Sequence, residues 1–288
     1  MIANARYAIA LLCVLVVLGF VIGYQLRSTE QLRQLEKIIL SHTQSPSAKR
    51  GKYKPNIGRS PKQPSVEALV QEWLAKDDIQ CFLDIGANVG GMTQFAINAN
   101  KHTLAVEPLQ KNLKFLIERI RKFHAVRLVD VLPYAISDEK STLEMTNENP
   151  SQLDTAYVIQ KNDKFGIPVN DGRVPVVSIT LNELIPKAKP CSKSIMKIDV
   201  QGHECFVLRK SDSFFKQINV PIIVMEWILA NRVDRQCNLD MIKTMMKLEY
   251  EPWYTNETTK VPLEELVRTV DTEDGELYDF VWKKSTTE

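Results

Sequence analysis

The chain contains no cysteine pair in the spacing Cys-x-x-Cys, although it has five cysteines. Zinc ribbons and thioredoxin-like redox motifs use that spacing, so the sequence supports neither. It also lacks a large excess of charge of either sign, because 37 basic and 35 acidic residues leave a net charge of +2. No basic stripe interleaved with aromatic residues is present, and we therefore expect no nucleic-acid partner.

The cysteines fall in different sequence contexts. Cys13 lies in an apolar leader, whereas Cys81 and Cys205 fall in strand and helix patterns. A buried free thiol is the role expected at those two positions. Cys191 and Cys237 lie in loop-like contexts and could pair in an oxidising compartment, but sequence alone does not test their proximity.

Charge is also absent between Arg6 and Arg27, and Tyr7–Tyr24 is almost entirely apolar. That length spans a hydrocarbon core of roughly 30 Å, with a tyrosine at each interface. The run is longer than the apolar core of most cleaved signal peptides. We therefore expect residues 1–26 to form a single-pass transmembrane signal anchor.

Two signals disagree on the orientation of this anchor. Arg6 precedes it and three basic residues follow it, namely Arg27, Arg33 and Lys37, so the positive-inside rule mildly favours a cytosolic catalytic domain. Asn256-Glu-Thr258 is a glycosylation acceptor pattern and favours a lumenal one. We expect an endoplasmic reticulum or Golgi protein with a lumenal catalytic domain, and the cytosol-facing orientation stays open.

Residues 27–65 are expected to form a stem and a linker. Leu32, Leu35 and Ile39 have helical spacing, and Ser41–Ser65 carries six Lys/Arg, four prolines and no acid. A solvated flexible linker is favoured there over attraction to anionic headgroups. Because Ser65 precedes an apolar helical pattern, we place the start of the main domain at residue 66 and its end at residue 288.

From residue 66 onward, short apolar runs alternate with amphipathic helices such as Leu109–Phe123. The predicted strands are Phe82–Ile85, Thr103–Val106, Val126–Leu132, Val174–Ile179, Ser194–Val200 and Pro221–Glu226, with a hairpin at Ser141–Met145. Tyr250–Tyr254 and Tyr278–Trp282 could pair as an antiparallel end. The pattern predicts an α/β, Rossmann-like domain with a mostly parallel, doubly wound sheet.

The turn after the first of these strands lacks the middle glycine of a dinucleotide-binding G-x-G-x-x-G motif. It is Gly86-x-x-x-Gly90-Gly91, with Asp84 two residues before the first glycine. An acid there repels a pyrophosphate but suits a cationic group, such as the amine of a methionine moiety. Glu107 ends the second strand and can accept hydrogen bonds from both hydroxyls of a phosphate-free ribose. These features favour S-adenosylmethionine over NAD as the ligand.

Six segments follow one another in a known family order: F-L-D-I-G-A-N-V-G (Phe82–Gly90), A-V-E-P (Ala105–Pro108), A-I-S-D (Ala135–Asp138), S-I-T-L-N-E-L (Ser178–Leu184), M-K-I-D-V-Q-G-H-E (Met196–Glu204) and V-M-E-W (Val224–Trp227). With them the chain resembles the FkbM family of S-adenosylmethionine-dependent methyltransferases. The resemblance implies a class I methyltransferase fold and, most often, methylation of a hydroxyl on a sugar or natural product. Gln201 stands where that family commonly has Glu, which puts any role of that acid in chemistry or metal binding in doubt here.

The resemblance also implies which residues hold the cofactor: Asp84, Gly86 and Gly90 along the methionine end, Glu107 and Pro108 at the ribose, and Ala135 and Ser137 beside the adenine. Asn88 belongs to the same turn and helps to shape it, since Asn tolerates left-handed backbone.

Asp199 and Glu226 end adjacent predicted strands, at the edge where open sheets bind ligands. Methyl transfer to a hydroxyl requires orientation and a proton acceptor. Asp199 is our first choice for the catalytic edge. His203 is a candidate base because the pKa of histidine lies near neutral, although a histidine at a helix start is more often structural. The two carboxylates could share Mg²⁺ with substrate oxygens, but two ligands are too few to predict a metal.

We therefore expect a membrane-anchored methyltransferase that uses S-adenosylmethionine on a small-molecule or glycan acceptor. The alternative is a non-catalytic relative that binds the cofactor or a partner. The predicted methionine, ribose and acidic-edge positions are all present, which favours the enzyme. The sequence does not identify the acceptor or the oligomeric state.

Overall fold

The computed structural model describes residues 29–41, 64–147, 156–159, 173–228, 235–270 and 277–285. The chain divides into two compact units, Met1–Ser47 and Ala48–Glu288. In the first unit residues 29–41 are helical, as the spacing of the stem predicted. None of the helices in the described ranges is long and apolar enough to cross a membrane. The anchor over residues 1–26 and residues 42–63 of the linker lie outside those ranges, so both stay predictions.

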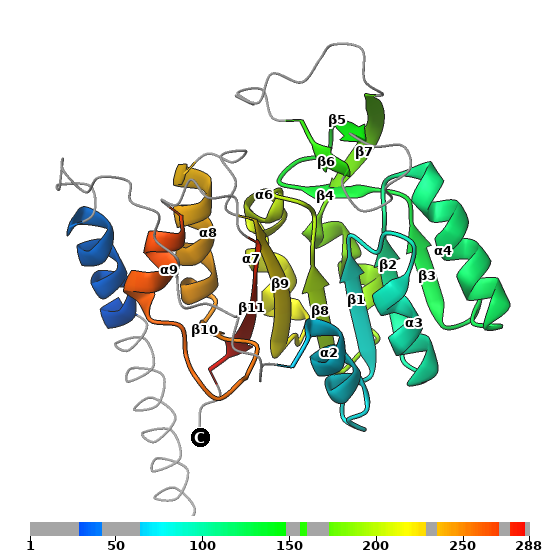
Figure 1. Cartoon of the computed structure of the whole chain (residues 1–288), viewed down its shortest axis with the longest axis horizontal. Coiled ribbons are helices and arrows are strands. Elements are labelled where there is room, and N and C mark those ends of the chain that lie inside the picture. The colour runs from blue at the N-terminus through cyan, green and yellow to red at the C-terminus, as the bar shows by residue number, and fades with distance from the viewer. Residues whose placement is uncertain are drawn as a thin grey trace, which may run out of the picture. The chain divides into compact units, whose positions relative to one another are not determined.

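The second unit is built on a seven-stranded sheet with the order β10-β11-β9-β8-β1-β2-β3 (Figure 1). The strands are β1 (Cys81–Ile85), β2 (His102–Val106), β3 (Val129–Leu132), β8 (Ser194–Ile198), β9 (Ile222–Ile228), β10 (Tyr250–Trp253) and β11 (Leu277–Lys284). Strands β3, β2, β1, β8 and β9 are parallel, whereas β11 runs antiparallel to β9 and to β10. The predicted parallel sheet with an antiparallel end is confirmed.

Helices cover this sheet and leave the carboxyl ends of its strands accessible. They are α2 (Val66–Leu74), α3 (Gly91–Asn98), α4 (Gln110–Lys122), α5 (Ile185–Ala188), α6 (Glu204–Leu208), α7 (Asp212–Gln217), α8 (Arg235–Lys247) and α9 (Leu263–Thr269), with a 3-10 turn at Leu181–Leu184. The Ser65 side chain caps α2 by accepting a hydrogen bond from the Ala68 amide. Val70 and Trp73 of α2 then pack against Phe82 in β1, which is buried along its whole length. Burial on both faces explains why β1 is a continuous apolar run rather than an alternating one.

A second, four-stranded sheet was not predicted as a separate layer. It has the order β4-β7-β5-β6 and contains β4 (Ala135–Ser137), β5 (Thr142–Asn147), β6 (Ala156–Val158) and β7 (Val174–Thr180). Figure 1 shows it beyond the carboxyl ends of β1, β2 and β8. The predicted hairpin at Ser141–Met145 and the strand at Val174–Ile179 both belong to this sheet, so it adds a wall to the ligand-binding edge.

The cysteine assignments from sequence were wrong. Cys81 pairs with Cys191 and Cys205 pairs with Cys237, with Cα–Cα distances of 5.9 and 5.7 Å. Cys81 and Cys191 meet because β1 pairs with β8 in a register that places Cys81 opposite Ser194. His102 lies 3.8 Å from the Cys81 sulfur, but both neighbouring sulfurs are in the disulfide and neither is available as a thiolate ligand.

Candidate active site

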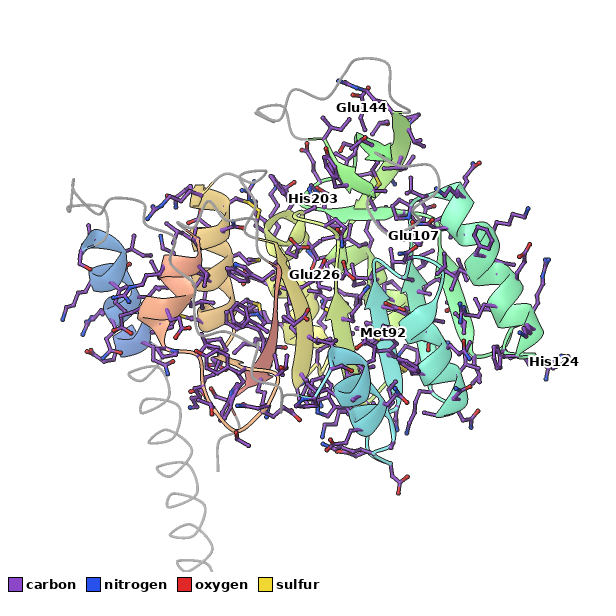
Figure 2. All side chains as sticks on the ribbon, viewed as in Figure 1. Met92, Glu107, His124, Glu144, His203 and Glu226 are labelled. Atoms are coloured by element: carbon purple, nitrogen blue, oxygen red, sulfur yellow. A yellow bond between two sulfur atoms is a disulfide. The ribbon has the colours of Figure 1, made fainter. Side chains whose placement is uncertain are left out.

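A cavity of about 440 Å³ lies between the carboxyl ends of the parallel strands and the second sheet. Its volume is in the range of sites that hold small molecules, about 300–1,000 Å³. Figure 2 shows Glu107, His203 and Glu226 at this edge. Of the residues predicted to form the site, the cavity is lined by Gly86, Asn88, Glu107, Pro108, Ala135, Asp199, His203 and Glu226. Asp84, Gly90 and Ser137 do not line it.

The turn after β1 requires glycine for steric reasons. Gly86 has a φ of +81°, and a Cβ on it would lie 1.9 Å from the Asp199 carbonyl oxygen. Asn88 has a φ of 51°, in agreement with its predicted left-handed conformation. Gly90, with a φ of +85°, caps α3, and a Cβ on it would lie 2.6 Å from the Leu116 side chain of α4. Gly86 thus shapes the cavity, whereas Gly90 allows close packing of α3 on α4.

Glu107 lies in the cavity and is 5% exposed. Its Oε2 accepts a hydrogen bond from the Asn88 amide at 2.9 Å, and its Oε1 accepts from the Leu109 amide at 3.0 Å and the Asn112 side chain at 3.2 Å. Burial raises the pKa of Glu107 above its usual value, although the three hydrogen bonds act in the opposite direction. A carboxylate has about four acceptor positions, so roughly one remains for a ligand hydroxyl. Glu107 therefore both fixes the glycine turn and presents an acceptor to the cavity.

Asp84 is fully buried beneath the turn rather than in the cavity. The Thr93 hydroxyl donates to its Oδ2 at 2.6 Å, and the Lys197 ammonium lies 3.7 Å from its Oδ1. Burial raises the pKa of Asp84, while Lys197 and Thr93 act in the opposite direction. Asp84 does not line the cavity, so the acid predicted to suit a cationic ligand group lies beneath the turn.

Lys197, in β8, joins the turn to the catalytic edge. Its ammonium donates to the Gly86 carbonyl at 2.5 Å and lies 3.1 Å from Asp199 Oδ2. Burial lowers the pKa of Lys197, but Asp199 and Asp84 outweigh burial and raise it. For Asp199 the balance is the reverse: burial raises the pKa, and the Lys197 charge brings it below its usual value. Lys197 is therefore a cation and Asp199 an anion.

Gln201 connects Asp199 and Glu226, the two acids of the predicted catalytic edge. Its side-chain nitrogen donates to Asp199 Oδ1 at 2.8 Å and to Glu226 Oε2 at 2.7 Å. Burial, followed by the charge of Asp199, raises the pKa of Glu226 to about 9. The pair thus carries one proton, held on Glu226, and one negative charge, held on Asp199.

Glu204 is the first residue of α6. It is 4% exposed, and its Oε1 accepts hydrogen bonds from the backbone amides of Val200 and Gly202, both at 3.1 Å. These bonds hold a loop in which Gln201 and Gly202 have positive φ values of 56° and 90°. Burial raises the pKa of Glu204 to about 7. Glu204 thus positions the loop between Asp199 and His203. The sequence feature that could have indicated this role is an acid two residues after a loop glycine.

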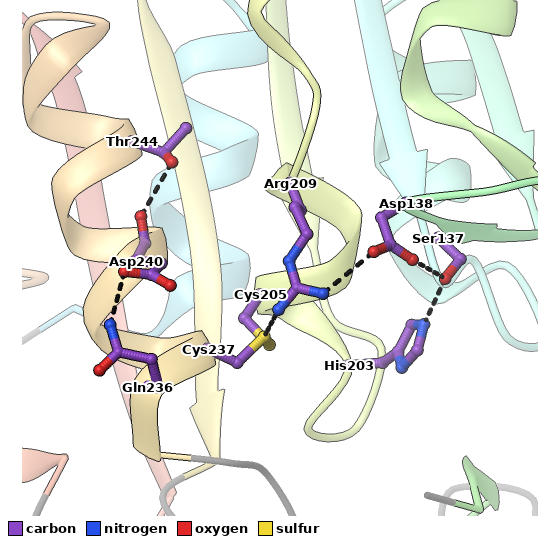
Figure 3. Close-up of a disulfide and its surroundings, with 9 residues drawn as sticks. All are labelled: Ser137, Asp138, His203, Cys205, Arg209, Gln236, Cys237, Asp240 and Thr244. Atoms are coloured by element: carbon purple, nitrogen blue, oxygen red, sulfur yellow. Dashed lines mark hydrogen bonds and ion pairs between the residues drawn. A yellow bond between two sulfur atoms is a disulfide. The ribbon is translucent and has the colours of Figure 1, made fainter.

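His203 is 4% exposed and its ring stacks on Phe206, with centroids 4.5 Å apart. Its Nε2 lies 3.0 Å from the Ser137 hydroxyl, which links it to β4 (Figure 3). Burial lowers the pKa of His203 to about 4. His203 is therefore uncharged at neutral pH, and the contacts with Phe206 and Ser137 hold its ring in the cavity wall.

An unpredicted set of contacts connects that wall to a disulfide (Figure 3). The Arg209 guanidinium lies 3.0 Å from Asp138 Oδ2 and donates to the Cys237 sulfur at 3.1 Å. Cys237 is bonded to Cys205 in α6, the helix that starts directly after His203. The second disulfide thus ties α8 to the helix beside the cavity.

Comparison with known proteins agrees with this arrangement. The sequence profile described as the Methyltransferase FkbM domain matches residues 84–252, more than half of the chain. The chain belongs to this family. The matched region starts at Asp84 and includes Glu107, Asp199 and Glu226, so the whole cavity edge belongs to the FkbM domain.

Solved methyltransferase structures that are similar to this chain have low sequence identity to it. An FkbM methyltransferase from Methylobacillus flagellatus is 12% identical, with 72% of this chain and 44% of that chain covered and a TM-score of 0.43. A precorrin-6y C5,15-methyltransferase from Geobacter metallireducens is 12% identical, with coverage of 80% and 95% and a TM-score of 0.41. The O-methyltransferase TomG from Streptomyces achromogenes, solved with S-adenosylmethionine, is 6% identical, with coverage of 78% and 83% and a TM-score of 0.40. No curated protein matches the sequence.

Proposed function

We propose that this FkbM-family chain is an S-adenosylmethionine-dependent O-methyltransferase that acts on a hydroxyl of a glycan or small metabolite. The observation that carries the proposal is the carboxyl pair Asp199–Glu226, bridged by Gln201, in a cavity next to the Gly86 turn. Such a pair provides one anionic acceptor and one protonated donor at the place where ligands bind in open parallel sheets.

The residues present fit S-adenosylmethionine. Gly86 leaves space where any side chain would collide with Asp199, and Glu107 retains an acceptor position for a ribose hydroxyl. Apolar groups from the second sheet border the remaining volume, namely Ala135, Ile136, Met145, Ala156 and Val158, and these suit an adenine ring. When bound, the cofactor supplies a methyl group on a positively charged sulfur.

In the proposed reaction, the cavity residues would hold and orient the acceptor hydroxyl, because a fixed orientation lowers the barrier to transfer. The hydroxyl proton passes to the Asp199 carboxylate. Glu226, protonated, orients the hydroxyl or Asp199 by hydrogen bonding, and it is not the base.

We propose that the catalytic domain faces the lumen of the endoplasmic reticulum or Golgi, with residues 1–26 as its anchor. The two disulfides support this location, because disulfides persist in oxidising compartments. Asn256 supports it too, since it lies partly exposed in a turn where its side chain accepts from the Thr258 amide at 3.1 Å. Sensitivity to a glycosidase that Asn256→Gln abolishes would support the lumenal side, and free thiols with no glycan would contradict it.

The test of the activity is incubation of the full chain with isotope-labelled S-adenosylmethionine and fractionated glycans and metabolites, followed by identification of the labelled product. Asp199→Asn should retain cofactor binding by calorimetry and lose turnover. Cofactor binding without transfer to any fraction would favour the non-catalytic alternative. A label on nitrogen or carbon, stable to conditions that cleave methyl ethers, would refute O-methylation while leaving the cofactor assignment intact.

A further inference from the structure

The cavity extends over four adjacent strands, in the order β9-β8-β1-β2. Glu226 lies on β9, whereas Glu107 directly follows β2, and Figure 2 shows both at this edge. Neighbouring strands of a sheet are about 4.8 Å apart, so three spacings place β9 and β2 roughly 14 Å from each other. With the cofactor at the Gly86 turn and Glu107, as the proposed function has it, the acceptor lies at the other end, over β8 and β9.

The β8–β9 end of the cavity offers acceptor oxygens to a ligand. Asp199 and Glu226 line it, and Asp199 carries the negative charge of the pair. The side-chain nitrogen of Gln201 donates to both acids, so the group that Gln201 offers to a ligand is its carbonyl oxygen. Hydrogen bonds from a charged donor to such oxygens are about twice as strong as those from a neutral donor.

The described residues that line the cavity include no Lys or Arg. His203 is among them, but its pKa of about 4 leaves it uncharged at neutral pH. Lys197 is 7% exposed and does not line the cavity, and its ammonium contacts the Gly86 carbonyl and the carboxylates of Asp199 and Asp84. A phosphate, sulfate or carboxylate on the acceptor would therefore meet the charge of Asp199 with no cationic side chain of the described lining to balance it.

The neighbouring strand β11 adds negative charge beside this end. Asp279 lies opposite Glu226 in the antiparallel pairing of β11 with β9, and it is exposed. Partial burial and the charge of Asp199 raise the pKa of Asp279 to about 6, so it is mostly ionised at neutral pH. In the sequence, residues 271–276 lead into β11 with four acids and no base, and residues 229–234 follow β9 with one of each. Charge of one sign near a site raises the local concentration of ligands of the opposite sign.

Building on the proposed O-methylation, we propose that the acceptor is a cationic amino alcohol, a class that includes sugars with a free amine. Its ammonium lies close to the hydroxyl that receives the methyl group. A carboxylate has about four acceptor positions, and Gln201 and Lys197 use two of those on Asp199, which leaves roughly two. One position takes the hydroxyl and the other takes the ammonium. Because the nearby carboxylate favours the protonated amine, the amine has no electron pair to accept the methyl group.

Binding of three matched sugars to the full chain with S-adenosylhomocysteine tests this preference without turnover. Glucosamine and glucose differ only by an ammonium in place of a hydroxyl at one ring carbon, and glucose 6-phosphate adds an anion. In calorimetry, glucosamine should bind about tenfold more tightly than glucose, and glucose 6-phosphate should bind more weakly than either. Raising the salt concentration should reduce these differences.

An acid-to-amide exchange beside the cavity tests the role of the neighbouring strand. Asp279→Asn should lower the advantage of glucosamine over glucose by about threefold, because it removes one exposed charge near the ligand. Asp77→Asn is the matched control. Asp77 is exposed and precedes β1, at the opposite edge of the sheet, so its replacement should leave the advantage unchanged.

The labelled-cofactor assay on glycan and metabolite fractions provides a second measurement. Acetic anhydride in water converts the amines of a fraction to neutral amides, and this treatment should remove most of the acceptor activity. Phosphatase treatment of the same fraction should leave the activity unchanged.

Equal affinities for glucosamine and glucose, no binding of either, or tighter binding of glucose 6-phosphate would overturn the proposal. Acceptor activity that survives acetylation would also overturn it, while leaving O-methylation of a neutral hydroxyl intact. Binding of Mn²⁺ that Asp199→Asn abolishes, and that removes the preference for glucosamine, would show that the acids hold a metal instead. Absence of transfer to every fraction would contradict the proposed function, and the binding comparison would still decide the charge of the ligand.

Discussion

Gly86 and Gly91 lie in the same glycine turn, and replacing each by alanine should have opposite effects. At Gly86 the φ of +81° is in the left-handed region, where an L-residue costs about 1–2 kcal/mol. The new Cβ would also lie 1.9 Å from the Asp199 oxygen and 3.0 Å from its carbonyl carbon. Since the obstruction is backbone, the end of β8 must shift. This shift endangers the hydrogen bond from the Asp199 amide to the Ile85 carbonyl, now 3.1 Å, which is worth about 1 kcal/mol.

Together these effects should lower the free energy of unfolding of Gly86→Ala by roughly 2–4 kcal/mol. A loss of that size lowers Tm by about 5–15 °C in a domain of this size. Gly91 is the first residue of α3, and a Cβ there would meet nothing within 4 Å. Gly91→Ala should therefore stabilise the protein by about 0.4–1 kcal/mol, because alanine has less freedom to lose on folding. Differential scanning calorimetry at one scan rate, with calorimetric titration of S-adenosylmethionine, measures both effects. A Gly86→Ala variant with unchanged Tm and unchanged cofactor affinity would refute the close packing of this turn against Asp199.

Three further predictions follow from the charges and cross-links. The pKa of Glu226 is raised from 4.5 to about 9, so the stability it contributes is complete below pH 4.5 and is lost as pH rises toward 9. Glu226→Gln should thus flatten the decline of Tm between pH 4.5 and about 9 in scanning fluorimetry, and an unchanged slope would contradict a proton held on Glu226. Glu107→Gln should weaken S-adenosylmethionine binding about tenfold in calorimetry, since a buried acceptor is replaced by a partial donor; an unaltered Kd would remove Glu107 from the cofactor site. The Cys81–Cys191 disulfide spans 110 residues, whereas Cys205–Cys237 spans 32. Cys191→Ser should therefore lower the free energy of unfolding, measured with denaturant, by about 1 kcal/mol more than Cys237→Ser does. A larger loss of stability for Cys237→Ser would show that chain entropy does not dominate the contribution of the disulfides.

Local patterns in the sequence were sufficient for the main sheet and the glycine turn. The parallel strands β1, β2, β3, β8 and β9 each overlap a strand predicted from sequence. The left-handed φ values of Gly86 and Asn88 reflect intrinsic preferences of Gly and Asn. The disulfides could not be predicted in the same way, because Cys81 and Cys191 become neighbours only through the pairing of β1 with β8. The second sheet was missed for the same reason, since β7 pairs with β4 and β5 from a distant part of the sequence.

The position of Asp84 illustrates a different limit. Strand alternation normally indicates which side chains face a ligand, but every residue of β1 is buried, so the pattern carries no such information. Only the contacts decide: Thr93 of α3 binds one oxygen of Asp84 and Lys197 lies beside the other. Gln201 is a comparable case, because its two carboxylate partners are on different strands and its function depends on their convergence.

The charges around Lys197 account for the kind of ligand that this edge favours. One ammonium faces two carboxylates, those of Asp84 and Asp199, and Glu226 adds a proton donor but no charge at neutral pH. The cluster therefore has one ammonium beside three carboxyl groups, and it has no excess of positive charge that would attract a pyrophosphate. A ligand with a positive centre suits the carboxyl oxygens better. Because Gln201 is neutral, it bridges the acids without adding a third negative charge. A glutamate at that position would make the cluster a stronger site for a divalent cation.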